Sequence, residues 1–495
     1  MTVPAVADSL NVKNFLSSVR LGTDQLTLTP MVQGNREKIV EEVSAEDRFV
    51  SSLAAVVYNM RPEEERFDKQ SIQELVNTID DLVEAQINEI IHAPEFQAME
   101  GAWRSVADLV RNTNFRANMD ITLLDATKDE VFEDLELNMA DVGGSELFKK
   151  LYVAEYDQFG GKPYGAIIGM YDFANTPKDT LWLRTMGKIA AASHAPFIGN
   201  VSPKFFGCES FAEVNQLRDI AGMIDTPRYS GWNELRNTEE AAYIGLTMPR
   251  YMVRTPWNDM TNPAENINFT ERVHGENLSE YVWGYASMLL ARNLTKSFES
   301  SGWCQHLRGV KGGGLVSGLP TYSFNLRGEE ELRAPIEISM PDFRELELAN
   351  AGVIPLIHKK GSADAVFFSV QSIKKVHKFK DPKDSENSQL VSNLSYTFSI
   401  SRIAHYVKCI MRDNIGSSAN AAYIQGQIDG WISRFVTTVV NPDDLTLRYF
   451  PFKAYSLSVN EVPGKVGWYH CNLSILPHIQ FEGMDVDLRV DARLG

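Results

Sequence analysis

The stretch Phe481-Glu-Gly-Met-Asp-Val-Asp-Leu-Arg-Val-Asp-Ala-Arg-Leu-Gly495 ends the chain on an alternating pattern. Val486, Leu488 and Val490 fall on one side of it, and aspartates and arginines fall on the other. This period of two predicts a β-strand with one buried and one hydrated face. Because the N–H and C=O groups of an edge strand invite a partner strand, the segment either closes a sheet of its own molecule or is lent to a neighbour.

The residues before this segment predict a small α+β domain over 388–495. Apolar periodicities indicate helices at about 388–413 and 418–439, with Gly416 and Pro442 as stop signals. Three strand-like runs follow, at 445–459, 466–476 and 484–491. We expect the last of them to be the outermost strand of the domain.

A basic segment over 371–387 separates this domain from the rest of the chain. Its lysines are Lys374, Lys375, Lys378, Lys380 and Lys383. A run of this kind is usually a hydrated linker. The alternative is a contact with an acidic face of a partner, which the acidity of the chain elsewhere would allow.

Residues 61–370 alternate between helix and strand signals, which predicts an α/β to α+β fold. Ser71-Ile-Gln-Glu74 has the pattern of a capping box, and it opens a helix with a broad apolar face that we expect to be buried. Pro94 begins a second helix that continues through Val110. The expected strands of this region are 119–124, 162–171, 354–357 and 365–370.

Residues 1–60 are predicted to be a connecting segment that carries a short amphipathic helix. Its apolar stripe consists of Val12, Phe15, Leu16 and Val19, at helical spacing. A helix this short is marginal alone in water, so it docks either on its own domain or on another protein.

The amino-acid composition is that of an ordinary globular protein with an excess of acidic residues. The 495 residues suffice for two to four domains, and the net charge of −17 argues against a nucleic-acid partner. We find neither a membrane span nor a basic, apolar leader. The four cysteines are far apart, which fits a reducing cytosol and predicts a cytoplasmic protein.

The motifs that could carry chemistry are weak. The glycine-rich run Gly309–Gly318 could cradle a phosphate, but it matches no established nucleotide-binding pattern, and a tight loop explains it better. Cys304 with His306, and Cys471 with its neighbouring histidines, lack the paired spacing of zinc ligands. His194 follows a run of small residues and is explained as well by packing as by base catalysis. We therefore expect no catalytic residue, cofactor or metal.

Several segments together resemble the large subunit of the type VI secretion contractile sheath, the ImpC/EvpB or VipB-like family. They are His92–Ser105, Leu147–Tyr152, Phe159–Gly165, Ala195–Phe197, Leu346–Leu356 and Ser401–Ile410. The resemblance extends from about residue 50 to the end of the chain. It implies a multidomain core similar to that of phage tail sheaths.

The resemblance also implies partners. Such a subunit pairs with a small sheath subunit and assembles with copies of itself into a helical tube around an inner tube of stacked hexamers. The tube stands on a baseplate in the cytoplasm of a Gram-negative bacterium, without insertion into the membrane. Contraction expels the inner tube, and a recycling AAA+ ATPase then recognises an N-terminal helix, which by resemblance is the stripe at residues 12–19.

Further roles follow from the resemblance. Protomers of the family are connected by exchanged terminal strands, which gives Val486, Leu488 and Val490 a role in assembly. Lys374, Lys375, Lys378 and Lys380 become candidates for contacts between protomers. A phage-tail or tailocin sheath, which needs one sheath polypeptide, and a cytosolic enzyme that uses the 309–318 loop remain as alternatives.

Overall fold

The computed structural model describes residues 69–493, except 266, 327, 378, 415–419, 440–441, 463–468 and 478–487. The chain divides into two compact units, Met1–Val83 and Glu84–Gly495, which are treated separately. Of the first unit, the structure describes the start of helix α4 (Lys69–Ile91), which begins two residues before the predicted capping box. All other elements belong to the second unit.

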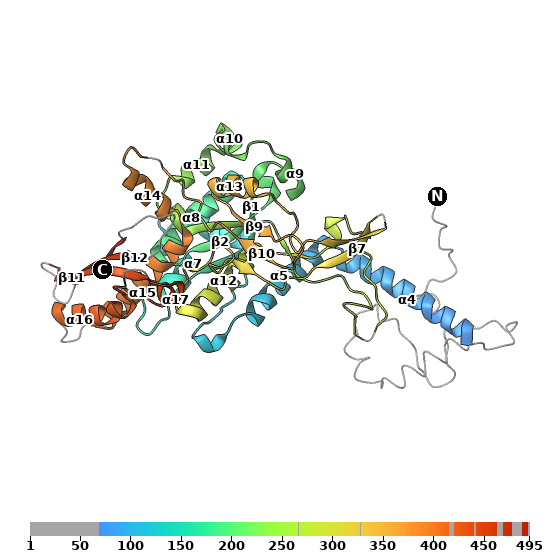
Figure 1. The fold of residues 1–495 in the computed structure, drawn as a ribbon, viewed down its shortest axis with the longest axis horizontal. Coiled ribbons are helices and arrows are strands. Elements are labelled where there is room, and N and C mark those ends of the chain that lie inside the picture. The colour runs from blue at the N-terminus through green and yellow to red at the C-terminus, as the bar shows by residue number, and fades with distance from the viewer. Residues whose placement is uncertain are drawn as a thin grey trace. The chain divides into compact units, whose positions relative to one another are not determined.

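A six-stranded mixed sheet forms the centre of the second unit (Figure 1). In spatial order its strands are β1 (Ile167–Phe173), β2 (Phe197–Val201), β3 (Ile244–Met248), β9 (Ile354–His358), β10 (Ala365–Phe367) and β6 (Leu315–Val316). The first four strands are parallel, and the last two add antiparallel pairs. The strands predicted at 354–357 and 365–370 are thus found within a few residues, and the strand predicted at 162–171 begins only at Ile167.

Helices cover both faces of this sheet (Figure 1). On one face α8 (Pro177–Ser193) and α13 (Asp342–Asn350) contribute to a large core that contains Trp182 and Met186. On the other face α12 (Ala286–Ser301) packs through Leu289 and Leu290. This three-layer arrangement explains why the residues of β2 and β3 are buried throughout.

Shorter elements connect these layers. The remaining helices are α5 (Pro94–Arg111), α6 (Lys128–Leu137), α7 (Glu146–Phe148), α9 (Phe211–Gln216), α10 (Ile220–Ile224) and α11 (Ser230–Arg236). Two small antiparallel pairs are β4 (Tyr251–Met252) with β5 (Trp283–Gly284), and β7 (Tyr322–Leu326) with β8 (Glu329–Arg333). The prediction of a strand at 119–124 was wrong, because those residues are not part of any sheet.

The C-terminal region builds a second core on a three-stranded antiparallel sheet. Its elements are α14 (Pro382–Val391), α15 (Leu394–Asp413), α16 (Ala421–Ile432), α17 (Asp444–Tyr449), β11 (Phe452–Glu461), β12 (Tyr469–Pro477) and β13 (Leu488–Arg493). The first predicted helix is divided at Asn393, whose side chain caps α15. The start of the strand predicted at 445–459 is helical, because the Asp443 side chain accepts a hydrogen bond from the Thr446 N–H.

Candidate assembly surfaces

The C-terminal strand pairs with β12 of its own chain in this structure. Leu488 is in register with Ile475, and Val490 with Leu473, while Val486 lies outside the described residues. Strand β13 occupies one edge of its sheet and β11 the other. A backbone ladder of this kind can form equally within one chain or between two, since main-chain hydrogen bonds supply the affinity.

The candidate lysines differ in their surroundings. The Lys374 Nζ lies 2.7 Å from a carboxylate oxygen of Glu239, and the Lys375 Nζ lies 3.5 Å from one of Asp225. Lys380 is exposed, and Lys378 is outside the described residues. Helix α14 begins within the 371–387 segment. The stripe of Val12, Phe15, Leu16 and Val19 also lies outside the described residues.

The apolar face of α4 is exposed, contrary to the prediction that it would be buried. Ile79, Leu82, Val83 and Ile90 all present large fractions of their side chains to solvent. Their spacing places them along one stripe of a helix. Ile87 and Ile91, which belong to the same predicted face, are half-buried. An exposed stripe of this extent is typical of a protein-binding surface.

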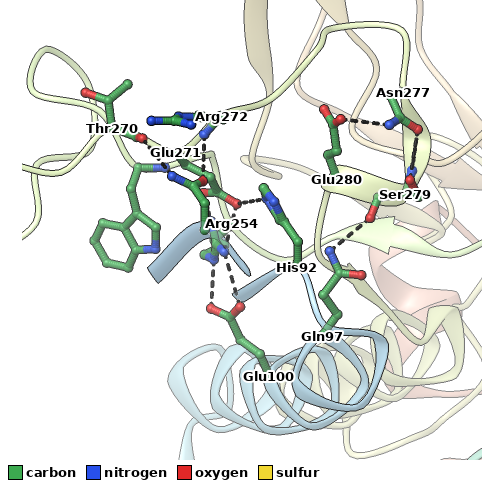
Figure 2. A network of polar contacts seen from close by, with 12 residues as sticks. His92, Gln97, Glu100, Arg254, Thr270, Glu271, Arg272, Asn277, Ser279 and Glu280 are labelled. Carbon is green, nitrogen blue, oxygen red and sulfur yellow. Dashed lines mark hydrogen bonds and ion pairs between the residues drawn. The ribbon is translucent and has the colours of Figure 1, made fainter. Parts of the chain in front are cut away.

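A buried polar network fixes the turn between α4 and α5 (Figure 2). Arg254 bridges two carboxylates: its Nε lies 2.7 Å from Glu100 Oε1, and its Nη1 lies 2.5 Å from Glu271 Oε2. Arg104 reaches Glu100 at 2.6 Å, and His92 Nε2 reaches Glu271 at 3.2 Å. Each carboxylate therefore has two basic or polar partners, which buried charges require.

The electrostatics of this network favour the charged forms. Burial raises the pKa of Glu100, but hydrogen bonds from Arg254 and Arg104 outweigh it and hold that pKa below its usual value. Burial likewise opposes the charge on Arg254, and its two carboxylate partners raise its pKa overall. His92, Glu100 and Arg104 belong to the His92–Ser105 segment of the resemblance, and the network ties that segment to the 254–271 loop.

One tryptophan links the two cores. Trp303 follows α12, whose last turn ends at Gly302 with a positive φ, and its ring is fully buried. The ring lies edge-on to Phe435 at 5.2 Å and to Phe452 at 5.1 Å, both in the C-terminal region. The guanidinium of Arg402 stacks on it at 5.1 Å. A side chain from the sheet domain thus completes the core of the C-terminal domain.

Helix α15 makes a second contact with the sheet domain. The Lys408 Nζ lies 4.5 Å and 4.2 Å from the ring centres of Tyr152 and Tyr156, and 3.1 Å from Asp157. The His405 ring lies 3.0 Å from the carbonyl oxygen of Ser193, to which it donates a hydrogen bond. We call the contacts of Trp303, His405 and Lys408 the joint.

His194 belongs to the joint as a packed residue. It ends α8 in the left-handed conformation, and its ring centre lies 6.3 Å from that of His405. Burial, together with the neighbouring positive charges, lowers the pKa of His194 to about 4, and burial lowers that of His405 to about 4 as well. Both rings are therefore neutral near pH 7, which suits packing.

The glycine-rich run is a tight backbone loop. The N–H of Gly314 donates to the carbonyl of Gly309, and the N–H of Gly309 donates to that of Phe367. A Cβ at Gly313 would overlap the backbone of His306. Two of its N–H groups are therefore engaged within the protein, which removes them from a phosphate cradle.

Groups that could hold a metal ion and helices that could span a bilayer were sought in the part of the chain that the structure describes. No group of three histidine, cysteine or carboxylate side chains is arranged there to hold a metal ion. Among the helices of these residues, none has the length and apolarity that a bilayer span requires.

Sequence comparison decides the family. The profile of the EvpB/VC_A0108 tail sheath N-terminal domain matches residues 73–374. That of the EvpB/VC_A0108 tail sheath gpW/gp25-like domain matches residues 383–494. The chain belongs to this tail sheath family. It is also 39% identical over 428 residues to the type VI secretion system sheath protein TssC1 of Pseudomonas aeruginosa, with 86% of each chain covered.

Two solved structures are more distant. The baseplate of the anti-feeding prophage matches 77% of this chain and 80% of its own at 12% identity, with a TM-score of 0.33. The contracted helical sheath of the same particle matches 64% of each chain at 11% identity, with a TM-score of 0.24. The family assignment rests on the sequence matches.

Membership of the tail sheath family confirms the resemblance. Three of the segments that carried it, Leu147–Tyr152, Ala195–Phe197 and Ser401–Ile410, lie at or beside the joint. These segments were identified from the sequence, but the sequence did not predict that they lie close together in the fold. Nothing in the sequence pointed to Trp303, because a single tryptophan after a helix has no pattern.

Proposed function

We propose that this chain is the large subunit of a contractile type VI secretion sheath. The observation that carries the proposal is the match of two tail sheath domains, which together span most of the chain. In this function the protein acts by assembly and movement in the cytoplasm, and no covalent chemistry is required. Copies of one heterologous contact, repeated with a rotation and a rise, generate an open helical tube.

A small sheath subunit is the first partner that we propose. The exposed apolar stripe of α4 supports it, because such a stripe costs free energy in water unless a partner covers it. An amphipathic helix of the partner could lie along Ile79, Leu82 and Val83. The inner-tube hexamers, the baseplate and the recycling ATPase, with Val12, Phe15, Leu16 and Val19 as its signal, complete the proposed set of partners.

During contraction, each folded protomer would move as a rigid body. The joint supports this, because a buried tryptophan and a caged lysine do not allow a hinge between the two domains without loss of packing. The connections between protomers must then bend instead. Exchange of the C-terminal strand would provide such a flexible tether, with β13 pairing to β12 of a neighbour in the register seen here.

Strand exchange has a direct test. Replacing Leu488 and Val490 with Asp should abolish tubes while the protein stays folded. The matched control is Glu461→Lys at the end of β11, which changes charge on the same sheet and should allow tubes to form. Tubes from the double variant would refute a role for this strand in assembly.

Contacts between protomers are proposed for the basic segment. Lys380 is exposed and available, whereas Lys374 is held by Glu239 within the same chain. Among these lysines, charge reversal at Lys380 is therefore expected to impair assembly with the smallest effect on folding.

The function is tested by negative-stain electron microscopy of the protein, purified alone and after co-expression with the small sheath subunit. Hollow tubes that form only with the partner are expected. Tubes formed by this chain alone would favour a single-polypeptide sheath of the phage-tail or tailocin type. Separate particles under both conditions would contradict the proposed function.

A further inference from the structure

The side chain of Asn293 is a buried amide without a hydrogen-bond partner in the protein. Asn293 lies in α12 and is 0% exposed to solvent. Neither its Nδ2 nor its Oδ1 forms a hydrogen bond with any residue that the structure describes. A buried amide in this condition costs free energy, because it has given up its hydrogen bonds to bulk water and gained none in return. Native proteins usually satisfy such a group.

Asn293 lies on the side of α12 that contacts the turn after this helix. Ser297 is four residues further along α12, and residues at this spacing share one face of a helix. The Ser297 hydroxyl donates a hydrogen bond to the carbonyl of Trp303 at 2.6 Å and accepts one from the N–H of His306 at 3.1 Å. The turn from Trp303 to His306 is therefore bonded to the helix face that also carries Asn293.

This turn contributes further unpaired polar atoms. Gln305 is 7% exposed, and its Oε1 is buried without a hydrogen-bond partner among the described residues. The indole N–H of Trp303 is buried in the same way, although a buried tryptophan usually donates this hydrogen bond. One face of α12 and the turn bonded to it thus bring together an amide, a side-chain carbonyl and an indole N–H that all lack partners.

Apolar side chains surround this part of α12. Leu290 and Leu294 of the helix pack in one cluster with Leu307, directly after the turn, and with Val316 of β6. Hydrocarbon side chains cannot form hydrogen bonds with an amide. Two explanations are therefore left for Asn293: either its amide stays unpaired in a dry core, or a small polar molecule is enclosed with it.

We propose that a water molecule is bound between Asn293 and the turn 303–306 as a permanent part of the fold. Water both donates and accepts hydrogen bonds, so it can serve Nδ2 and Oδ1 of Asn293 together with Gln305. Buried waters typically make about three hydrogen bonds to groups that are otherwise unpaired. A metal ion is a poorer occupant, because the described residues contain no cluster of side chains suited to hold one. The proposal does not depend on the sheath function.

The bound water would help to position Trp303 in the joint. It would connect α12, which packs on the central sheet, to the turn that carries the indole into the core of the C-terminal domain. The Ser297 hydroxyl fixes this turn at two points, and the water would add a third. Asn293 is in this sense a positioning residue, which acts on the joint through the water and the turn.

The variant Asn293→Leu distinguishes the two explanations by the sign of its effect. Leucine is close to asparagine in shape but has no polar atoms. With water bound, the change removes two of its hydrogen bonds, so the equilibrium constant for unfolding should rise by about 10-fold in urea titrations. In a dry core the change removes an unpaired amide, and the protein should become more stable. A gain in stability, or no change, would overturn the proposal.

A matched variant corrects for the exchange itself. Asn350→Leu makes the same replacement at an exposed position of α13, where no amide is buried. Its unfolding constant should not rise, since leucine forms helices better than asparagine. A rise equal to that of Asn293→Leu would show that the exchange, and not the buried site, causes the effect, which would also overturn the proposal.

A crystal structure of the wild-type protein, at a resolution that shows ordered water, tests the site without a variant. We expect a water molecule at about 2.7–3.2 Å from both Nδ2 and Oδ1 of Asn293. Absence of water at this position, or a direct hydrogen bond from the amide to another residue of the protein, would overturn the proposal. This measurement decides the question even if Asn293→Leu does not fold.

Discussion

The joint and the outer surface use similar residues for opposite purposes. At the joint, Trp303 is fully buried between two aromatic rings, and Lys408 is enclosed by tyrosines. On the outer surface, Trp103 is 64% exposed, and Ile79 and Ile90 of α4 are 45% and 48% exposed. Both regions are rich in apolar and aromatic side chains. The two regions differ in whether other residues of the same chain bury these side chains. The buried side chains stabilise the protomer, and the exposed ones are available for contacts with other subunits.

This difference matters for a contractile sheath protein. A rigid protomer with open surfaces can change its neighbours without changing its own fold. Substitutions at the joint should therefore lower the stability of the isolated chain. Substitutions on the outer surface should leave that stability unchanged and affect only the assembly.

The largest expected effect on stability comes from Trp303→Ala. Removing a fully buried indole should lower the free energy of unfolding of the C-terminal domain by about 3–5 kcal/mol. Urea unfolding followed by circular dichroism measures it. The matched change Trp103→Ala should leave the midpoint where it is, because that ring is mostly in solvent. Equal shifts for the two tryptophans would remove the distinction between the regions.

Arg254→Gln should have the next largest effect. It leaves Glu100 and Glu271 buried with only Arg104 and His92 as basic partners, which should cost about 3 kcal/mol. Thermal unfolding measures the loss. Lys162→Gln breaks the exposed ion pair with Asp120 and serves as control, with no shift expected. A small effect at Arg254 would mean that the network contributes little to the position of α5.

Acid should weaken the joint. The pKa of His194 and that of His405 are both about 4 in the folded protein, against about 6.5 for an unfolded histidine. The unfolded chain therefore takes up protons first, so stability is complete above about pH 6.5 and falls as the pH decreases toward 4. At pH 5.5 the loss is about 1 kcal/mol for each histidine.

A variant separates this contribution from other acid effects. His405→Gln keeps a side-chain N–H for the Ser193 carbonyl but cannot titrate, so it should remove about half of the loss between pH 7.5 and 5.5. Urea midpoints at the two pH values measure this. His377→Gln, at an exposed position, should retain the wild-type pH dependence. Identical pH dependence in the His405 variant would contradict a role for the joint.

The smallest effect on stability is expected at α4. Ile79→Glu with Val83→Glu should leave the unfolding midpoint of the isolated chain unchanged, because both side chains are already exposed. The same variant should lose co-purification with the small subunit, since a helical apolar contact does not tolerate two carboxylates. A destabilised chain that still binds the partner would reverse the interpretation of this helix.

The sequence predicted elements better than it predicted their burial. Helix α5 and the strands β1, β9 and β12 follow from local periodicity, so they were found within a few residues, whereas the helix predicted at 388–413 is divided at Asn393. The apolar period of α4 was also real, but Ile79, Leu82, Val83 and Ile90 along it are exposed. Periodicity shows that an element has an apolar face. It does not show whether that face is buried by residues of the same chain or by another protein.

The joint was beyond sequence reasoning for a different reason. It brings together segments from near residues 152, 194, 303 and 405, and no local pattern encodes such distant contacts. The buried network at Arg254 has the same character, because its carboxylates come from α5 and from the 254–271 loop. Those contacts depend on the topology of the sheet, which positions the loops.

The most direct test is a cryo-electron microscopy structure of this protein assembled with the small sheath subunit. We expect a helical tube in which Trp303 still packs between Phe435 and Phe452, while the α4 stripe is covered by the partner. A tube in which the joint has opened, or in which the α4 stripe remains exposed to solvent, would contradict the account.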